Sequence, residues 1–170
     1  MSRIISLVII AAAAFACTSN SPKSEDKDNA LKPIPIVNFD GVKPLLNKST
    51  DSLYVINFWA TWCAPCVKEI PYFERLAEEF ANRKLKVILI NLDFSNHYES
   101  RLLPFVEKNG VKSKIVMLDD PDANRWINQV DPSWSGAIPA TLIYNKTERK
   151  FFEKEFTYEE LKEAVNTFTF

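Results

Sequence analysis

The stretch from residue 54 to residue 71 reads YVINFWATWCAPCVKEIP and decides how the rest of the chain is interpreted. It begins with an apolar run, as expected for a strand that helices cover on both faces. It ends in an amphipathic pattern typical of a helix, which continues to about residue 82. Cys63 and Cys66 lie between the two patterns, and Trp62 directly precedes them. A Cys-x-x-Cys pair where a strand meets a helix predicts a redox-active dithiol.

The rest of the chain alternates between strand and helix patterns. We expect strands over residues 53–59, 85–92 and 114–118, and a hairpin formed by residues 140–144 and 150–156. We expect helices over residues 66–82, 98–109, 122–130 and 158–168. Residues 37–48 predict only one helical turn or an irregular cover. This order predicts an α/β fold in which helices flank a mixed central sheet.

The composition narrows the class of protein. A chain of 170 residues that is 46% hydrophobic fits one globular domain with a substantial core. The net charge of −1 leaves no basic surface of the kind that binds nucleic acid. Three cysteines are too few for a disulfide-stapled scaffold, and a single histidine excludes a His-rich metal site.

The N-terminal residues predict export. Arg3 precedes an apolar run over residues 4–15, and the small residue Ala16 stands directly before Cys17. This is typical of a secretory signal over residues 1–16, which is too short to span a bilayer. Cys17 directly after a small residue resembles a bacterial lipoprotein signal, in which this cysteine is lipidated; a plain cleaved signal is the alternative. The polar composition of residues 18–32 predicts a flexible tether, which makes residues 17–32 anchor and tether and residues 33–170 the folded domain.

The positions of the two cysteines suggest different roles. Cys63 lies where the helix begins, so the unpaired N–H groups and the helix dipole favour its thiolate by lowering a thiol pKa that is ordinarily about 8.5. Cys66 lies one turn later, should be more buried, and would resolve the mixed disulfide. Ala64 and Pro65 limit the turn between them and help to set the redox potential. A zinc knuckle would need a second Cys/His pair, which is missing, whereas a permanent disulfide remains an alternative.

Several other side chains are candidates for the site. Glu69 is on the same helix face as Cys66; if partly buried, it would have a raised pKa and could exchange a proton with Cys66, whereas an exposed surface Glu is the alternative. Trp62 is expected to be a half-exposed platform beside Cys63. Trp126 and Trp134 either line a client groove or pack in the core, and core packing is favoured for Trp126. His97 is interpreted as a solvated loop residue, with copper ligation as the alternative.

Residues 58–66 (FWATWCAPC), followed by Glu69 and Pro71, resemble the membrane-tethered thioredoxin-like proteins of the TlpA/ResA type. Residues 136–141 (GAIPAT) are similar to the cis-proline segment of that family, and the agreement extends from about residue 53 to the C-terminus. The resemblance implies a thioredoxin-like fold with an extra helix–strand insertion and a cis bond before Pro139, which turns the Ile138 backbone toward an extended client peptide. Asn57 stands where thioredoxins themselves carry a buried Asp, and in the TlpA/ResA-type family the position of Glu69 supplies the carboxylate.

The same resemblance implies a thiol–disulfide oxidoreductase, usually a reductase, that faces the periplasm as a membrane-anchored lipoprotein. Its partners would be client proteins with a disulfide or a cysteine pair, apocytochrome c among the candidates, and a membrane electron donor. It implies no cofactor beyond the redox-active Cys63–Cys66 disulfide, and no metal. The alternatives are a copper-handling thioredoxin-fold chaperone for respiratory oxidases, which would carry Cys-x-x-x-Cys and a distant His, and a non-catalytic thioredoxin-fold adaptor.

Overall fold

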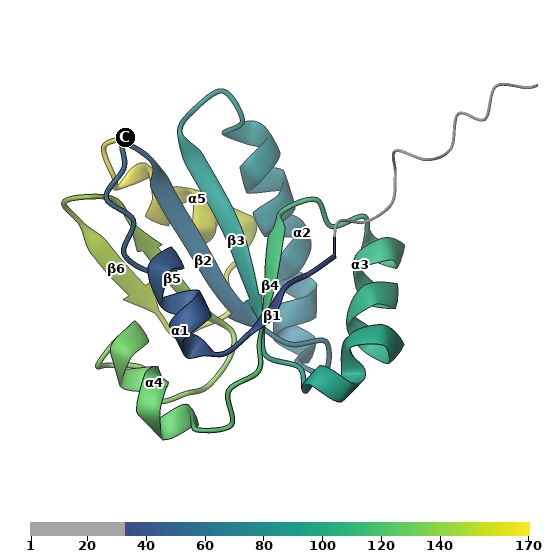
Figure 1. Ribbon diagram of the computed structural model, residues 1–170. Helices are drawn as coiled ribbons and strands as arrows, with labels where there is room; N and C mark the ends of the chain where they lie inside the picture. The colour runs from purple at the N-terminus through teal and green to yellow at the C-terminus, as the bar shows by residue number, and fades with distance from the viewer. Residues whose placement is uncertain (1–32) are drawn as a thin grey trace, which may run out of the picture. The chain divides into compact units, whose positions relative to one another are not determined.

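A computed structural model describes residues 33–170 (Figure 1). The predicted signal over residues 1–16, the lipidation of Cys17 and the tether over residues 17–32 lie outside the described residues.

The described residues contain one six-stranded mixed sheet in the order β1-β4-β3-β2-β5-β6. Strands β1, β4, β3 and β2 are parallel, whereas β5 is antiparallel to β2 and β6 is antiparallel to β5. The strands are β1 (Ile36–Val37), β2 (Leu53–Trp59), β3 (Leu85–Asn91), β4 (Lys114–Leu118), β5 (Ala140–Tyr144) and β6 (Arg149–Phe152). Every residue of β2 is buried, which explains why its sequence is a continuous apolar run rather than an alternating one.

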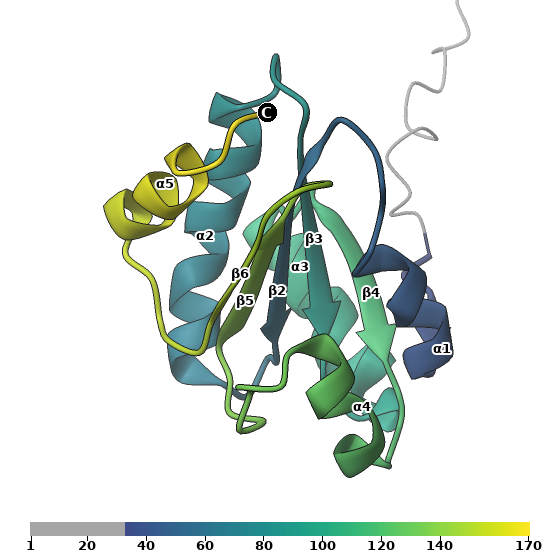
Figure 2. The same cartoon turned by 90° about the vertical axis from the view of Figure 1, so that its left-hand side faces the viewer.

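Helices cover both faces of the sheet, with α2 and α5 on one side and α1 and α4 on the other (Figure 2). Leu102 and Val106 of the segment around α3 pack into the same core cluster as Phe73 of α2. The helices are α1 (Phe39–Val42), α2 (Ala64–Glu79), α3 (Leu103–Asn109), α4 (Ala123–Val130) and α5 (Tyr158–Asn166). A mixed sheet between helix layers confirms the predicted α/β class.

The two tryptophans assigned to a client groove or to the core both lie in the core. Trp126 and Trp134 are buried in the cluster under α1 and α4, with their rings 5.7 Å apart. Of the two alternatives for Trp134, groove lining is therefore excluded and core packing is the one observed. Its indole N–H donates to the carbonyl of Ala137 (2.8 Å), so the ring is buried without an unpaired donor.

Three predicted segments differ in detail from the structure. The strand β1 precedes the expected helical turn, and its two residues are too few to show a period. The helix expected at residues 98–109 begins as a π-helical segment (Tyr98–Leu102) before α3, where Pro104 lacks the N–H that a regular helix would use. The last strand ends at Phe152 rather than at residue 156, and the N–H of Phe156 donates to the Glu69 carboxylate (2.9 Å) instead of to a strand partner.

The strand directions bring distant segments to one edge of the sheet. Because β5 is antiparallel to β2, the start of β5 lies beside the end of β2, and Ala140 pairs with Phe58. Pro139 therefore lies next to the segment that carries Cys63. The parallel neighbour β3 ends at the same edge, where Asn91 pairs with Trp59. Ligands and substrates of open α/β sheets bind at such carboxyl ends.

Candidate functional site

Cys63 and Cys66 form a disulfide with an S–S distance of 2.01 Å at the start of α2. Cys63 is the N-cap of this helix, and its Sγ accepts a hydrogen bond from the N–H of Cys66 (3.3 Å). The Cys63 sulfur therefore lies at the positive end of the helix dipole, where a developing thiolate is favoured. Cys63 is 6% exposed and Cys66 is fully buried, so the predicted order of depth is confirmed. Cys63 itself is largely covered, and the Ile138 carbonyl of the cis-proline loop lies close to its sulfur.

The residues around the two sulfurs lie at the surface. Trp62 is 55% exposed, as expected for a platform beside Cys63. Ala64 is exposed and Pro65 is half-buried in the first turn of α2. Pro65 fits this turn because its missing N–H would have no partner within the helix. The helix continues through Pro71 to Glu79.

The loop before β5 places its backbone against the disulfide. The Ile138–Pro139 peptide bond is cis, as the family resemblance implied. The carbonyl oxygen of Ile138 lies 3.7 Å from the Cys63 Sγ. Gly136 has a φ of +94°, which side chains rarely adopt, so glycine allows this turn. The Ile138 backbone and the reacting sulfur thus lie side by side.

Glu69 lies on α2 three residues after Cys66, and its side chain is fully buried. Its Oε1 accepts from the Asn57 side-chain amide (2.8 Å), and its Oε2 accepts from the N–H of Phe156 (2.9 Å). Burial raises the pKa of Glu69 from 4.5 to about 7, against the two hydrogen bonds that lower it. The same Asn57 amide donates to the hydroxyl of Thr141 (3.1 Å). Of the two alternatives for Glu69, the exposed surface residue is therefore excluded.

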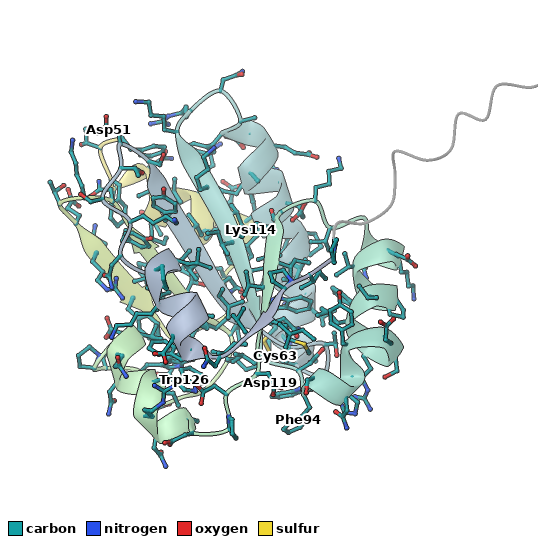
Figure 3. The ribbon with its side chains drawn as sticks, in the orientation of Figure 1. Asp51, Cys63, Phe94, Lys114, Asp119 and Trp126 are labelled. Carbon is teal, nitrogen blue, oxygen red and sulfur yellow. A yellow bond between two sulfur atoms is a disulfide. The ribbon has the colours of Figure 1, made fainter. Side chains whose placement is uncertain are left out.

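The loop after β3 supplies two residues that the sequence analysis did not assign to the site. The carboxylate of Asp93 accepts from the N–H of Thr61 (2.9 Å), which ties this loop to the one that carries Trp62. The next residue, Phe94, is 69% exposed. Figure 3 shows Phe94 and Cys63 at the same end of the sheet, opposite Asp51. An aromatic residue three positions after the end of β3, at the edge where the cysteines lie, was the available signal.

Two further observations concern metals and membranes. His97 is half-buried at the end of a 3₁₀ turn (Ser95–His97), with its ring 6.1 Å from that of Phe94. Within residues 33–170, no three side chains of the His, Cys, Asp or Glu type come close enough to hold a metal ion. In the same part of the chain, no helix has the length and apolar character needed to cross a bilayer.

Comparison with known proteins assigns the family. The AhpC/TSA family matches residues 11–149, which is most of the chain. The chain belongs to the AhpC/TSA family. Two solved structures, each less than 25% identical to this chain, have the same thioredoxin-like fold. One is a DsbF homologue from Corynebacterium diphtheriae (TM-score 0.58, 24% identity), which covers 70% of this chain and 73% of that one. Another is StoA from Bacillus subtilis (TM-score 0.54, 22% identity), which covers 69% of this chain and 84% of that one.

Among curated proteins, this AhpC/TSA chain is similar in sequence to the thiol-disulfide oxidoreductase ResA of Halalkalibacterium halodurans. The two are 29% identical over 91 residues, which is 54% of this chain and 47% of the relative. The chain thus spans about half the length of the first curated relatives that it matches.

Proposed function

We propose that this protein is a thiol–disulfide oxidoreductase that reduces disulfides of client proteins through Cys63 and Cys66. The observation that carries the proposal is the place of the Cys63 sulfur. It receives the Cys66 N–H at the start of α2 and lies 3.7 Å from the Ile138 carbonyl, beside a backbone that an extended peptide can pair with. A permanent structural disulfide has no need of this position at the sheet edge where open α/β sheets bind their ligands.

The reaction proceeds in two exchanges. In the dithiol form, the Cys63 thiolate attacks one sulfur of the client disulfide, which forms a mixed disulfide and releases the other client sulfur as a thiolate. Cys66 then loses its proton and attacks the Cys63 sulfur, which closes the Cys63–Cys66 disulfide and releases the second client sulfur. The client gains two electrons and the protein loses two. A membrane electron donor restores the dithiol for the next cycle.

Glu69 accepts the proton of Cys66 in the second exchange. A carboxyl group with a pKa of about 7 is close to evenly divided between its two forms near neutral pH, so it can take up and return a proton there. Asn57 and Phe156 hold the carboxylate through their N–H groups. A neutral amide such as that of Asn57 cannot do this work itself.

Client binding uses the backbone of Ile138 and two exposed aromatic side chains. An extended client segment pairs with the Ile138 edge, in the manner of strand addition. Trp62 and Phe94 contact the side chains on either side of the client cysteine, because both are exposed and belong to loops that Asp93 ties together. The partner is therefore a protein with a disulfide or a cysteine pair in an accessible, extended segment.

The setting of the reaction is extracytoplasmic and at a membrane. The apolar run before Cys17 supports export, and lipidation of Cys17 would anchor the protein there. One structural neighbour is a secreted disulfide oxidoreductase of Mycobacterium tuberculosis (21% identity, TM-score 0.53). Apocytochrome c, which carries a cysteine pair, is a client of the required chemistry, and cytochrome c maturation is the corresponding process.

The test is a stoichiometric reduction of a peptide disulfide by the full-length protein. The protein is reduced, freed of reductant and mixed with a peptide that contains one internal disulfide. We expect one peptide dithiol to appear for each Cys63–Cys66 disulfide that closes, and we expect Cys63→Ser to abolish the reaction. A reduced protein that leaves the peptide disulfide intact would refute the proposed function.

A further inference from the structure

The carboxylate of Glu153 binds the loop that leads to the cis-proline. Glu153 directly follows β6, and its side chain reaches across to the loop before β5. One carboxylate oxygen accepts from the N–H of Ser135 (3.0 Å), and the other accepts from the N–H of Ala137 (3.2 Å) and from the hydroxyl of Ser135. Three donors of this one loop thus converge on one side chain.

The loop has few other means of keeping its shape. Residues 135–139 belong to no helix or strand, and Gly136 in their middle adopts a positive φ. The indole of Trp134 anchors the carbonyl of Ala137 from the core side (2.8 Å). Glu153 binds the N–H groups on the other side, so the peptide units around Gly136 are held at both ends. The next residue is Ile138, whose carbonyl lies beside the Cys63 sulfur.

The neighbours of Glu153 show that this contact is specific to it. Lys154 pairs with Glu160 at the start of α5 (2.7 Å), and Glu155 pairs with Lys68 of α2 (2.5 Å). Both are ion pairs between side chains at the surface, of a kind that contributes little, whereas Glu153, which is also exposed, has backbone N–H groups as partners. Only Glu153 of these three is directed to the cis-proline loop, where charge-assisted bonds to backbone N–H groups are the stronger kind.

We propose that Glu153 is a positioning residue for client binding, which fixes the loop Ser135–Ala137 so that the Ile138 backbone is ready to pair with an extended client segment. The inference rests on the proposed function and adds a residue to it. Glu153 touches neither the sulfurs nor the client. It acts by ordering the loop before the client binds. A loop that becomes ordered only on binding loses conformational entropy at that step, which lowers the affinity for the client.

This role separates two kinds of substrate. A peptide disulfide needs the Ile138 edge, whereas a small aromatic disulfide reaches the Cys63 sulfur without pairing with any backbone. Loosening the loop should therefore weaken the reaction with the peptide and spare the reaction with the small molecule. The variants are Glu153→Ala, which removes every acceptor, and Glu153→Gln, which keeps one acceptor oxygen. Glu163→Ala, an exposed Glu on α5, is the matched control.

The experiment measures single-turnover oxidation of each reduced full-length protein against increasing substrate. For Glu153→Ala we expect the half-saturating peptide concentration to rise about five- to tenfold, as a loss of preorganisation predicts. The maximal rate with the peptide and the rate with the small aromatic disulfide should stay within about twofold of the unmodified protein, as a change confined to binding requires. The half-saturating peptide concentration of Glu153→Gln should lie between those of the unmodified protein and Glu153→Ala. That of Glu163→Ala should match the unmodified protein.

Two results would overturn the inference. One is an unchanged half-saturating peptide concentration in Glu153→Ala. The other is an equal loss with both substrates in Glu153→Ala and Glu153→Gln, which would indicate general damage to the fold. Inactivity of the unmodified protein toward both disulfides is a different result, because it would refute the proposed function itself.

Discussion

The buried carboxyl group of Glu69 makes a quantitative prediction about stability. In the folded protein this group has no contact with solvent, and two N–H groups, of Asn57 and Phe156, point at it. Replacement by Gln keeps the size of the side chain and removes the titration. The Oδ1 atom of Asn57 is buried and unpaired within residues 33–170, so a turn of that amide lets it accept a hydrogen bond from the new side chain.

The sign follows from the direction of the shift. The pKa of Glu69 is about 7 when folded, against an ordinary value of 4.5, so the folded state holds the proton more tightly than the unfolded state. Stability from this group is therefore fully present below pH 4.5 and is lost as the pH rises through 7. With these two values, the loss between pH 5 and pH 8 amounts to about 2–3 kcal/mol. The variant Glu69→Gln does not suffer this loss.

The assay is urea unfolding of the oxidised protein at pH 5 and at pH 8, followed by tryptophan fluorescence. We expect the free energy of unfolding of Glu69→Gln, relative to that of the unmodified protein, to be about 2–3 kcal/mol higher at pH 8 than at pH 5. Glu163→Gln on the exposed face of α5 is the control, for which the difference should not change with pH. Parallel pH profiles of the unmodified protein and Glu69→Gln would refute the reasoning.

Two further substitutions test the loops around the disulfide. Asp93→Ala leaves the N–H of Thr61 without its acceptor, and we expect the free energy of unfolding to fall by about 1–3 kcal/mol. Asp93→Asn keeps one acceptor oxygen, so its free energy of unfolding should fall less. Equal losses for the two variants in urea unfolding would contradict this account. Phe94→Ser should raise the half-saturating concentration of peptide disulfides with apolar flanking residues about fivefold, since it removes an exposed aromatic contact. For peptides with polar flanking residues, the half-saturating concentration should not change. The control is Ile36→Ser, which replaces an exposed apolar residue on the edge strand β1 and should leave the half-saturating concentration of every peptide unchanged. An equal change for all peptides in Phe94→Ser would exclude Phe94 from client recognition.

The sequence predicted well the segments that have a long hydrophobic pattern or whose structure depends on residues close by in the chain. The strand β2 and the start of α2 follow from an apolar run that ends at a cysteine pair, and Cys63 caps the helix as its position suggested. The strand β1 was missed because two residues at a sheet edge show no alternation.

The parts of the site that the sequence left open depend on distant residues. Helical spacing places Glu69 on the face that carries Cys66, but one of its hydrogen-bond donors is the N–H of Phe156, which is 87 residues further along the chain. Glu153 reaches Ser135 across the hairpin, 18 residues away, and no local pattern marks an exposed Glu for that task. The cis bond before Pro139 came from the family resemblance, since the residues alone favour the trans form.

The measurement that tests the central claim most directly is the capture of a client on one identified sulfur. The variant Cys66→Ser is reduced, mixed with the peptide disulfide and digested, and the cysteine that carries the peptide is located by mass spectrometry. We expect a stable mixed disulfide on Cys63, because the attacking sulfur is present and the resolving sulfur is missing. A peptide attached to Cys17 alone, or to no cysteine at all, would contradict the account.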